Sequence, residues 1–237
     1  MNHQEARKLI EEGFRRCYGQ LPTREQAQCL QAIGWLETNY AQGWSEKILG
    51  ARESNNWGAI TAGSGWSGAT FDHRDSYPDD KGVNHWYVTK FRSYPSLQDG
   101  ATDLCNIVYL TRDKAVLHAA TLGSTLSFST ALYNTGYYKG FGATADERIA
   151  HHHAAVQSAI ALQCRELGEP PPYPIDDARF YELATAAEKQ CNARARAEEW
   201  LTSLDADFDG HGAANIPAEL ERHDTDPSDL AVLVDKE

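Results

Sequence analysis

Apolar side chains recur at helical spacing along much of the chain, most regularly over residues 26–40. There they come every three or four positions, as on one face of an α-helix, at Ala27, Leu30, Ile33, Leu36 and Tyr40. Thr23 and Gln26 form the pattern of an N-terminal capping box, and Gln42-Gly43 predicts where the helix ends. Glu37 lies on or beside the apolar face. Partial desolvation there would raise the pKa of its carboxyl group, which suits a general acid; the alternative is a surface glutamate at a helix edge.

The same spacing predicts further helices over residues 3–17, 97–109, 113–122, 126–135 and 144–167. Residues 50–68 are rich in Gly, Ser and Asn and are expected to form a loop. Residues 69–77 and 83–93 resemble two strands, joined by a good turn sequence at 78–82. In the first strand, one face would carry Phe71, His73, Asp75 and Tyr77.

This order predicts an α+β fold, mainly helical, with a small β hairpin inserted in an α domain. A Pro-rich stretch at 169–175 is a candidate linker. It would separate a main domain, residues 1–168, from a C-terminal helical appendage, residues 176–237. From residue 170 onward the chain holds 16 acidic and 6 basic side chains, so this appendage carries most of the net charge of −12.

Composition narrows the class of protein. The sequence contains no run of 18 apolar residues, so it predicts no membrane-spanning helix. Its excess of acidic over basic side chains is unlike that of a nucleic-acid-binding protein. The five cysteines lack paired CxxC spacing, so buried free thiols are expected instead of a zinc site or a disulfide framework. The first residues lack the apolar core of a signal peptide. We therefore expect synthesis in the cytoplasm, with delivery by lysis, a virion or a specialised secretion system.

Several short segments, taken in order, resemble a known family. They are Leu36-Glu37-Thr38-Asn39-Tyr40, Ser54-Asn55-Asn56-Trp57-Gly58-Ala59-Ile60, Lys90-Phe91-Arg92-Ser93-Tyr94 and Ala131-Leu132-Tyr133-Asn134-Thr135-Gly136-Tyr137. Over about residues 20–165 this order is similar to the glucosaminidases of glycoside hydrolase family 73, which are peptidoglycan hydrolases of the lysozyme-like superfamily. The resemblance implies a two-lobed lysozyme-like domain that cleaves β-1,4 bonds of the glycan strand.

The resemblance also implies roles for individual residues. Glu37 corresponds to the general acid of the family, and Tyr137 to a cleft tyrosine near the reacting sugar. A loop that closes one side of the cleft corresponds to Asn55, Asn56 and Trp57. Sugar faces are expected to pack on Trp57, Trp66, Trp86 and Tyr137, and the alternative for each of these aromatic residues is core packing.

A second acidic residue is expected in the hairpin, where the resemblance favours Asp75 over Asp72, Asp79 and Asp80. It would activate water or stabilise the developing positive charge, and the N-acetyl group of the sugar is an alternative nucleophile. Around Glu37 the family usually has Glu-Ser-Gly-Trp-Gly, whereas this chain has Glu-Thr-Asn-Tyr-Ala. An N-acetylmuramidase or a lytic transglycosylase, with Glu53 as rival acid, is therefore an alternative. A non-catalytic cell-wall-binding or virion structural module is another.

Two other motifs suggest metal chemistry. Asp205, Asp207 and Asp209 match the first ligand positions of a calcium loop, but Ile216 stands where a glutamate is expected. Calcium at 205–219 is one interpretation and an acidic turn is the other. The run His151-His152-His153 cannot chelate one ion from a single helix and is expected on a solvated face. The proposed glycosidase chemistry requires no cofactor. The acidic appendage is a candidate surface for an immunity protein or for a virion or secretion partner.

Overall fold

The computed structural model describes residues 1–44, 50–78, 84–110, 114–172 and residue 185, without the side chains at 75–78, 84 and 110. The predicted appendage, apart from residue 185, lies outside these ranges. So do Asp205, Asp207 and Asp209 of the candidate calcium loop, together with Asp79 and Asp80 of the hairpin turn.

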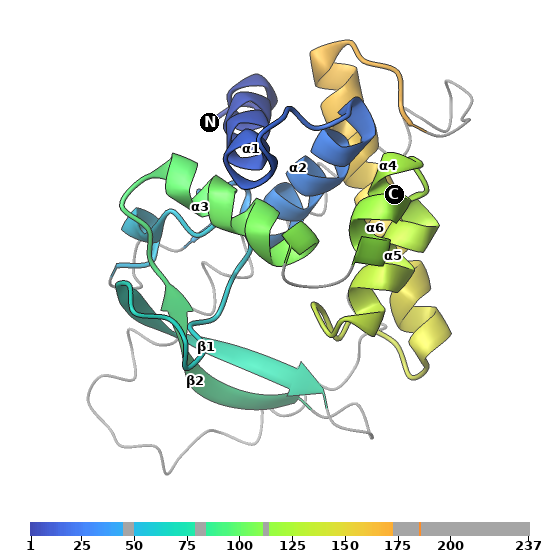
Figure 1. The fold of residues 1–237 in the computed structure, drawn as a ribbon. Helices are drawn as coiled ribbons and strands as arrows, with labels where there is room; N and C mark the ends of the chain where they lie inside the picture. The colour runs from blue at the N-terminus through green and yellow to red at the C-terminus, as the bar shows by residue number, and fades with distance from the viewer. Residues whose placement is uncertain (45–49, 79–83, 111–113, 173–184, 186–237) are drawn as a thin grey trace.

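The described elements confirm the predicted α+β order, helices on either side of one hairpin (Figure 1). The helices are α1 (His3–Tyr18), α2 (Arg24–Thr38), α3 (Leu97–Cys105), α4 (Lys114–Thr121), α5 (Thr125–Asn134) and α6 (Ala145–Leu167). The antiparallel strands are β1 (Thr70–Pro78) and β2 (Asn84–Arg92). A short 3-10 turn, η1 (Arg52–Ser54), precedes the hairpin, and a π-helical turn, η2 (Asn106–Leu110), continues α3.

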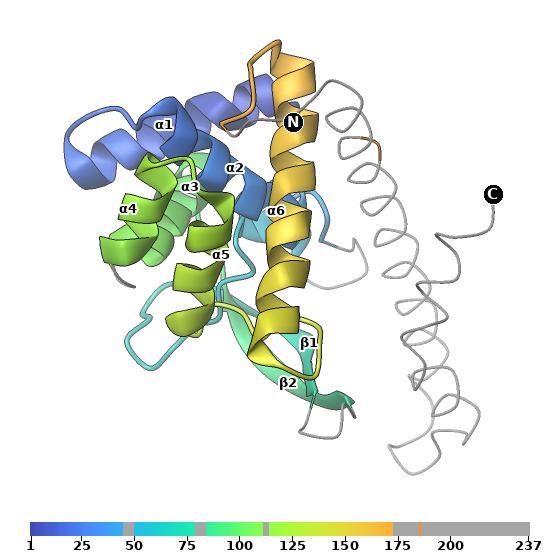
Figure 2. The ribbon, with the colours of Figure 1, turned by 90° about the vertical axis from the view of Figure 1, so that its right-hand side faces the viewer.

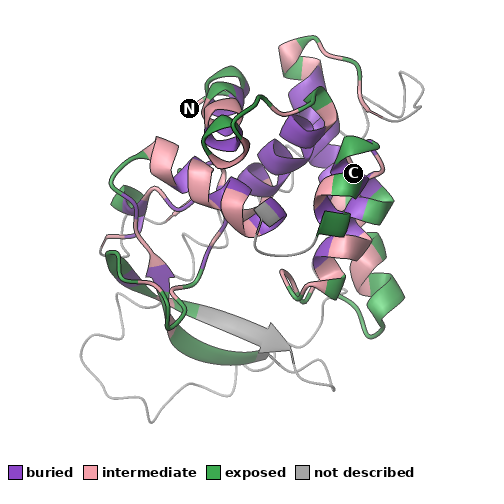
Figure 3. Ribbon diagram, in the orientation of Figure 1, coloured by how far each residue is buried: buried purple, intermediate pink, exposed green. Residues whose placement is uncertain are grey.

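Helix α2 is the centre of the α lobe. Eleven of its fifteen residues are buried, so it is enclosed on nearly all sides, by α1, α3, α4 and α6. Figure 3 shows this as an almost continuous buried stretch, whereas most of the described hairpin is exposed. Close packing extends to Gly34, where an added Cβ would lie 3.0 Å from the Trp57 ring. The apolar periodicity of residues 26–40 therefore belongs to a core helix.

The start of α2 confirms the predicted capping box, but its predicted end is wrong. Thr23 Oγ1 accepts from the Gln26 amide at 3.2 Å, and Gln26 Oε1 accepts from the Thr23 amide at 2.8 Å. The helix ends at Thr38, four residues before the predicted end at 42. The reason is that the backbone turns left-handed over residues 39–41, with φ values of 47°, 57° and 67°. Glu37 is consequently the last helical residue but one.

The hairpin packs a small core of its own. Phe71 lies opposite Phe91 in the register, and their ring centroids are 5.7 Å apart. On the other edge of β2, the Arg92 amide donates to the Ile60 carbonyl at 2.9 Å, and the Ala62 amide donates to the Lys90 carbonyl at 2.7 Å. The loop before the hairpin thus pairs with β2 through an isolated antiparallel bridge, Thr61 to Phe91. It ties the hairpin to the end of α2.

Helix α6 is the longest described helix, with 23 residues, and it stands along one side of the α lobe (Figure 2). Its buried positions run from Val156 to Cys164. Beyond its end, Glu169 pairs with Arg7 at 3.2 Å and accepts from Gln28 Nε2 at 3.3 Å. The first residue of the candidate linker therefore contacts α1 and α2. None of the described helices is long and apolar enough to cross a membrane.

The described cysteines confirm the expectation of free thiols. Cys29, Cys105 and Cys164 are buried and Cys17 is partly buried, and all four are free. Burial raises the pKa of the Cys29 thiol to about 12, so it is protonated and unreactive at neutral pH.

Gly100 is where α3 approaches the loop before the hairpin most closely. A Cβ at this position would lie 1.8 Å from the Asn55 carbonyl oxygen. We expect Gly100→Ala to lower the free energy of unfolding by about 3 kcal/mol, because backbone must move to admit the methyl group. Urea denaturation would measure this effect. Gly63→Ala is the control, since nothing lies within 4 Å of a Cβ there; equal losses in the two variants would contradict the packing argument.

Candidate active site

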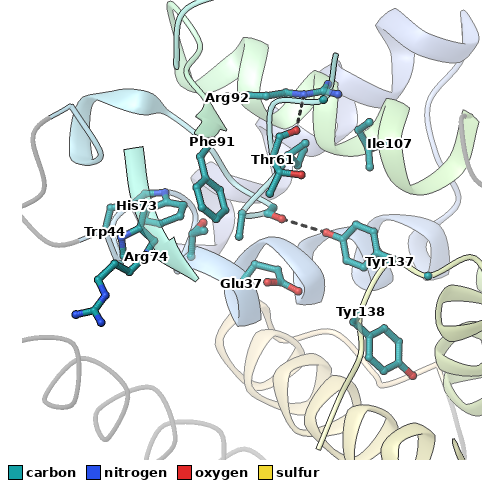
Figure 4. A pocket seen from close by; sticks show the side chains of 17 residues that line it. Glu37, Trp44, Thr61, His73, Arg74, Phe91, Arg92, Ile107, Tyr137 and Tyr138 are labelled. Atoms are coloured by element: carbon teal, nitrogen blue, oxygen red, sulfur yellow. Dashed lines mark hydrogen bonds between the residues drawn. The ribbon is translucent and has the colours of Figure 1, made fainter. Parts of the chain in front are cut away.

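A cleft of about 550 Å³ lies between the end of α2, the hairpin and the loop after α5 (Figure 4). Its floor includes Glu37 and Thr38. One wall comes from the hairpin side and the other from the α lobe. Trp44, His73, Arg74, Phe91 and Arg92 line the hairpin side, and Ile107, Gly136, Tyr137 and Tyr138 line the other. Ile107 comes from the π-helical turn η2, a type of distortion that is frequent at functional sites.

Glu37 is partly exposed, and its side chain points into this cleft on the side where Tyr137 lies (Figure 4). Tyr137 Oη lies 3.4 Å from the Gly58 carbonyl oxygen, which brings the loop after α5 next to the loop before the hairpin. The rival acid Glu53 is exposed in η1 and does not line the cleft. Of the two glutamates, Glu37 lines this cleft and Glu53 does not.

The end of α2, and with it Glu37, is held by a dense set of hydrogen bonds. Thr38 Oγ1 donates to the Trp57 carbonyl at 2.7 Å and accepts from the Ala41 amide at 2.9 Å. The Gly43 amide donates to the Thr38 carbonyl at 2.7 Å. Three consecutive left-handed residues other than glycine, 39–41, are costly on their own. These bonds hold that backbone, and the helix end that carries Glu37, in place.

Tyr40 anchors the same turn to the core of the α lobe. Its ring is buried, and its hydroxyl hydrogen-bonds to Nδ1 of His3 in α1. Burial, followed by the charges of Arg7 and Arg165, lowers the pKa of His3 to about 4. His3 Nε2 is also 3.6 Å from Glu166. Because His3 is neutral at neutral pH, this contact is not an ion pair there, and Tyr40 faces an uncharged partner.

The buried histidine predicts a pH dependence of stability. In the unfolded chain His3 titrates near its ordinary pKa of 6.5, and in the folded chain near 4. Between these values the unfolded state binds more protons. The contribution of His3 to the free energy of unfolding is therefore at its maximum above pH 6.5, and it falls as the pH drops towards 4. Urea denaturation across this window should show a shallower decline for His3→Gln than for the parent. Parallel pH profiles would contradict the assignment.

The structure places the predicted loop Asn55-Asn56-Trp57 beside the cleft, but as its support. Asn56 is fully buried. Its Nδ2 donates to the carbonyls of Ile60 and Arg92 at 3.0 and 2.9 Å, and its Oδ1 accepts from the Ile60 amide at 2.9 Å. Asn55 Nδ2 donates to the Tyr94 carbonyl at 2.9 Å. These side chains hold the loop to β2 and to the segment that follows it.

Trp57 has no exposed surface and packs on Tyr40, with ring centroids 5.3 Å apart. Trp57 is therefore a core residue. The expectation that it packs on a sugar face is wrong, because a fully buried ring has no surface that a sugar could contact. Trp66 and Trp86 also lie outside the cleft lining. Trp66 stacks under the Arg92 guanidinium at 4.7 Å. Trp86 is 42% exposed on β2, with the Arg74 guanidinium 5.5 Å from its ring.

Asp75 lies in β1 opposite Tyr87, two residues beyond His73. Its side chain is not among those that the structure describes. The assignment of Asp75 as second acid consequently stays a prediction. Asp72 is exposed and pairs with Lys90 at 2.9 Å.

Tyr138 completes the α-lobe wall and is held from behind. Its ring stacks on His152 of α6 at 3.8 Å, and its hydroxyl donates to the Ser129 carbonyl at 2.9 Å. His152 and His153 lie 3.0 Å from the hydroxyls of Ser129 and Thr125 in α5. His151 is exposed, as expected of a solvated face, whereas His152 and His153 are partly buried against α5. The described residues contain no group of three side chains suited to hold a metal ion.

Three aromatic residues of the cleft carry no role in the sequence interpretation: Trp44, His73 and Tyr138. Trp44 follows the predicted helix end at Gln42-Gly43, and His73 shares a predicted strand face with Phe71. The strand alternation was the only sequence signal for His73, since it placed His73 on the same face as Phe71. In the structure Phe71 and its partner Phe91 are buried, and His73 continues their face towards the cleft.

A polar cluster fixes the hairpin to α3. Arg92 Nη1 lies 2.7 Å from Asp103 Oδ2, which also accepts from the Tyr94 hydroxyl at 2.6 Å. Burial, followed by the charge of Asp103, raises the pKa of the Tyr94 hydroxyl well above its ordinary value. The cluster ties the end of β2 to α3.

No protein-family model and no curated protein matches this chain. Among solved structures, it is similar to a mutant of a peptidoglycan hydrolase from Sphingomonas sp. A1, with 21% identity, a TM-score of 0.47, and coverage of 69% of this chain and 92% of that one. It is also similar to the glycoside hydrolase domain from Salmonella typhimurium FlgJ, with 19% identity, a TM-score of 0.43, and coverage of 70% and 94%. The catalytic domain of the autolysin Auto from Listeria monocytogenes is similar at 16% identity, with a TM-score of 0.42 and coverage of 66% and 84%.

Proposed function

We propose that this chain is a peptidoglycan hydrolase of the glucosaminidase family, which cleaves β-1,4 glycosidic bonds of the glycan strand at the bacterial cell wall. The observation that carries the proposal is the place of Glu37, at the end of a buried helix and at the floor of an aromatic-walled cleft. The order of sequence segments around Glu37 and Tyr137 supports the same assignment.

The chemistry assigns Glu37 the role of general acid. A glycosidic bond breaks when its oxygen receives a proton while positive charge builds on the sugar ring. The fixed helix end keeps the Glu37 backbone at the floor of the cleft, which limits the motion needed to bring its carboxyl to the leaving oxygen. Tyr137, on the side of the cleft towards which Glu37 points, is proposed to contact the sugar next to the bond that breaks.

Asp75 is proposed as the second acidic group, which would activate a water molecule or stabilise the charged sugar. It follows Phe71 and His73 at the two-residue repeat of a strand, and this repeat supports its placement on the cleft side of the hairpin. A carboxylate held on a separate lobe favours attack by water with inversion over a covalent intermediate.

Release of soluble glycan fragments from purified peptidoglycan tests the proposed function. We expect the 237-residue chain to release fragments catalytically, so that a small molar amount of protein solubilises most of the material. Co-sedimentation with the insoluble peptidoglycan is measured in parallel. Binding without any release would overturn the proposal in favour of a non-catalytic wall-binding module.

A further inference from the structure

We propose that Trp44 and His73 form a sugar-binding surface on the hairpin side of the cleft, which sets the affinity for an N-acetylated hexosamine unit beside Glu37. This inference rests on the proposed function and assigns the two residues to substrate recognition. Both line the cleft and both are partly exposed, whereas the three tryptophans predicted for this purpose from the sequence lie in the core (Trp57) or outside the cleft lining (Trp66 and Trp86).

The surface is backed by a rigid apolar cluster. The Trp44 ring meets Phe71 and Phe91 edge-on, with centroid distances of 5.1 and 5.5 Å, and both phenylalanines are buried. His73 lies at right angles to Trp44, with centroids 5.4 Å apart, and also contacts Phe91 at 5.7 Å. The two partly exposed rings therefore form the front of an aromatic cluster, and Figure 4 shows them together on one side of Glu37.

Trp44 is also fixed relative to the proposed acid. Its indole Nε1 donates to the Asn56 carbonyl at 2.9 Å. The residue before it, Gly43, donates its amide to the carbonyl of Thr38, which follows Glu37 in the chain. A Cβ on Gly43 would lie 2.9 Å from that carbonyl oxygen, so the turn is as tight as glycine permits. Acid and aromatic surface thus belong to one stiff unit.

The two rings suit the two kinds of surface that a hexosamine offers. A pyranose ring has apolar C–H faces that pack on an aromatic ring, and polar groups at its edge. The indole N–H of Trp44 is already used within the protein, so Trp44 offers apolar ring surface. His73 adds a polar imidazole edge beside the Trp44 ring, and such an edge suits the hydroxyl and acetamido groups at the edge of the same sugar.

Binding of β-1,4-linked N-acetylglucosamine hexamer, measured by calorimetry, tests this inference. All variants carry Glu37→Gln, so that the ligand is not cleaved during the titration. We expect His73→Ala to raise the dissociation constant about tenfold, the equivalent of one good contact. Trp44→Phe keeps an aromatic ring in the cluster and is expected to raise it by a smaller factor. Thermal unfolding of each variant shows whether the fold is kept.

Trp86→Ala is the matched control, since it removes an exposed tryptophan from the same hairpin but outside the cleft lining. Its dissociation constant should equal that of the parent. If His73→Ala and Trp44→Phe both bind as the parent does, the inference is overturned while the proposed function stands. If the parent binds neither the hexamer nor soluble glycan strands released from peptidoglycan, the proposed function falls as well.

Discussion

Replacing Glu37 with glutamine is expected to lower the rate of glycan-fragment release about a thousandfold, within the range that a positioned general acid contributes. Glutamine has nearly the same size and can keep the contacts of the helix end, but it has no proton of suitable acidity to give to the leaving oxygen. Binding to insoluble peptidoglycan should stay close to that of the parent. The rate is measured as soluble reducing sugar released per unit of time.

Glu53→Gln is the matched control for this prediction. Glu53 is the rival acid, and it is exposed in η1 outside the cleft lining. Its replacement should leave the rate within about twofold of the parent, as expected for a surface substitution. Loss of activity in Glu53→Gln, with activity kept in Glu37→Gln, would transfer the role of acid to Glu53.

Replacing Asn56 with alanine is expected to lower the free energy of unfolding by about 3–6 kcal/mol. The fully buried amide makes three hydrogen bonds to the backbone of residues 60 and 92. Each buried group left without a partner costs about 1–3 kcal/mol. The same bonds join the loop beside α2 to β2, so the cleft should lose its shape along with stability. Urea denaturation and the rate of fragment release are the two measurements.

Two variants make the Asn56 prediction specific. Asn56→Asp keeps the acceptor for the Ile60 amide but loses both Nδ2–H donors. Its loss in the free energy of unfolding is therefore expected to exceed that of Asn106→Ala. Asn106→Ala removes one long contact of 3.4 Å, to Asp103, from a partly exposed side chain, and should cost less than about 1 kcal/mol. A loss in Asn56→Ala as small as that in Asn106→Ala would contradict a structural role for Asn56.

Local sequence rules predicted the parts of the fold that local interactions determine. The capping box at Thr23 and Gln26 is such a case, since both partners lie within one turn. The end of α2 is the opposite case. The apolar spacing continues to Tyr40, and that residue is buried as predicted, yet it reaches the core from a left-handed turn. Contacts with Trp57 and His3, distant in sequence, hold that turn, so the pattern alone could not reveal it.

The aromatic residues around the cleft likewise could not be assigned from local sequence patterns. Trp44 and Trp57 both lie in irregular segments, and nothing in their immediate neighbours distinguishes a cleft residue from a core residue. Trp57 is buried because Gly34 of α2 leaves room for its ring, which is a contact across 23 positions of sequence. Glu37 could be found from its helical face and from the family resemblance, whereas its surroundings required the packed structure.

Mass spectrometry of the sugar ends in digested peptidoglycan tests the central claim most directly. Fragments made by the parent protein are compared with those made by Glu37→Gln at equal concentration. We expect new reducing ends of N-acetylglucosamine from the parent, and none above background from the variant. New reducing N-acetylmuramic acid ends, anhydro ends, or N-acetylglucosamine ends that persist in Glu37→Gln would contradict the account.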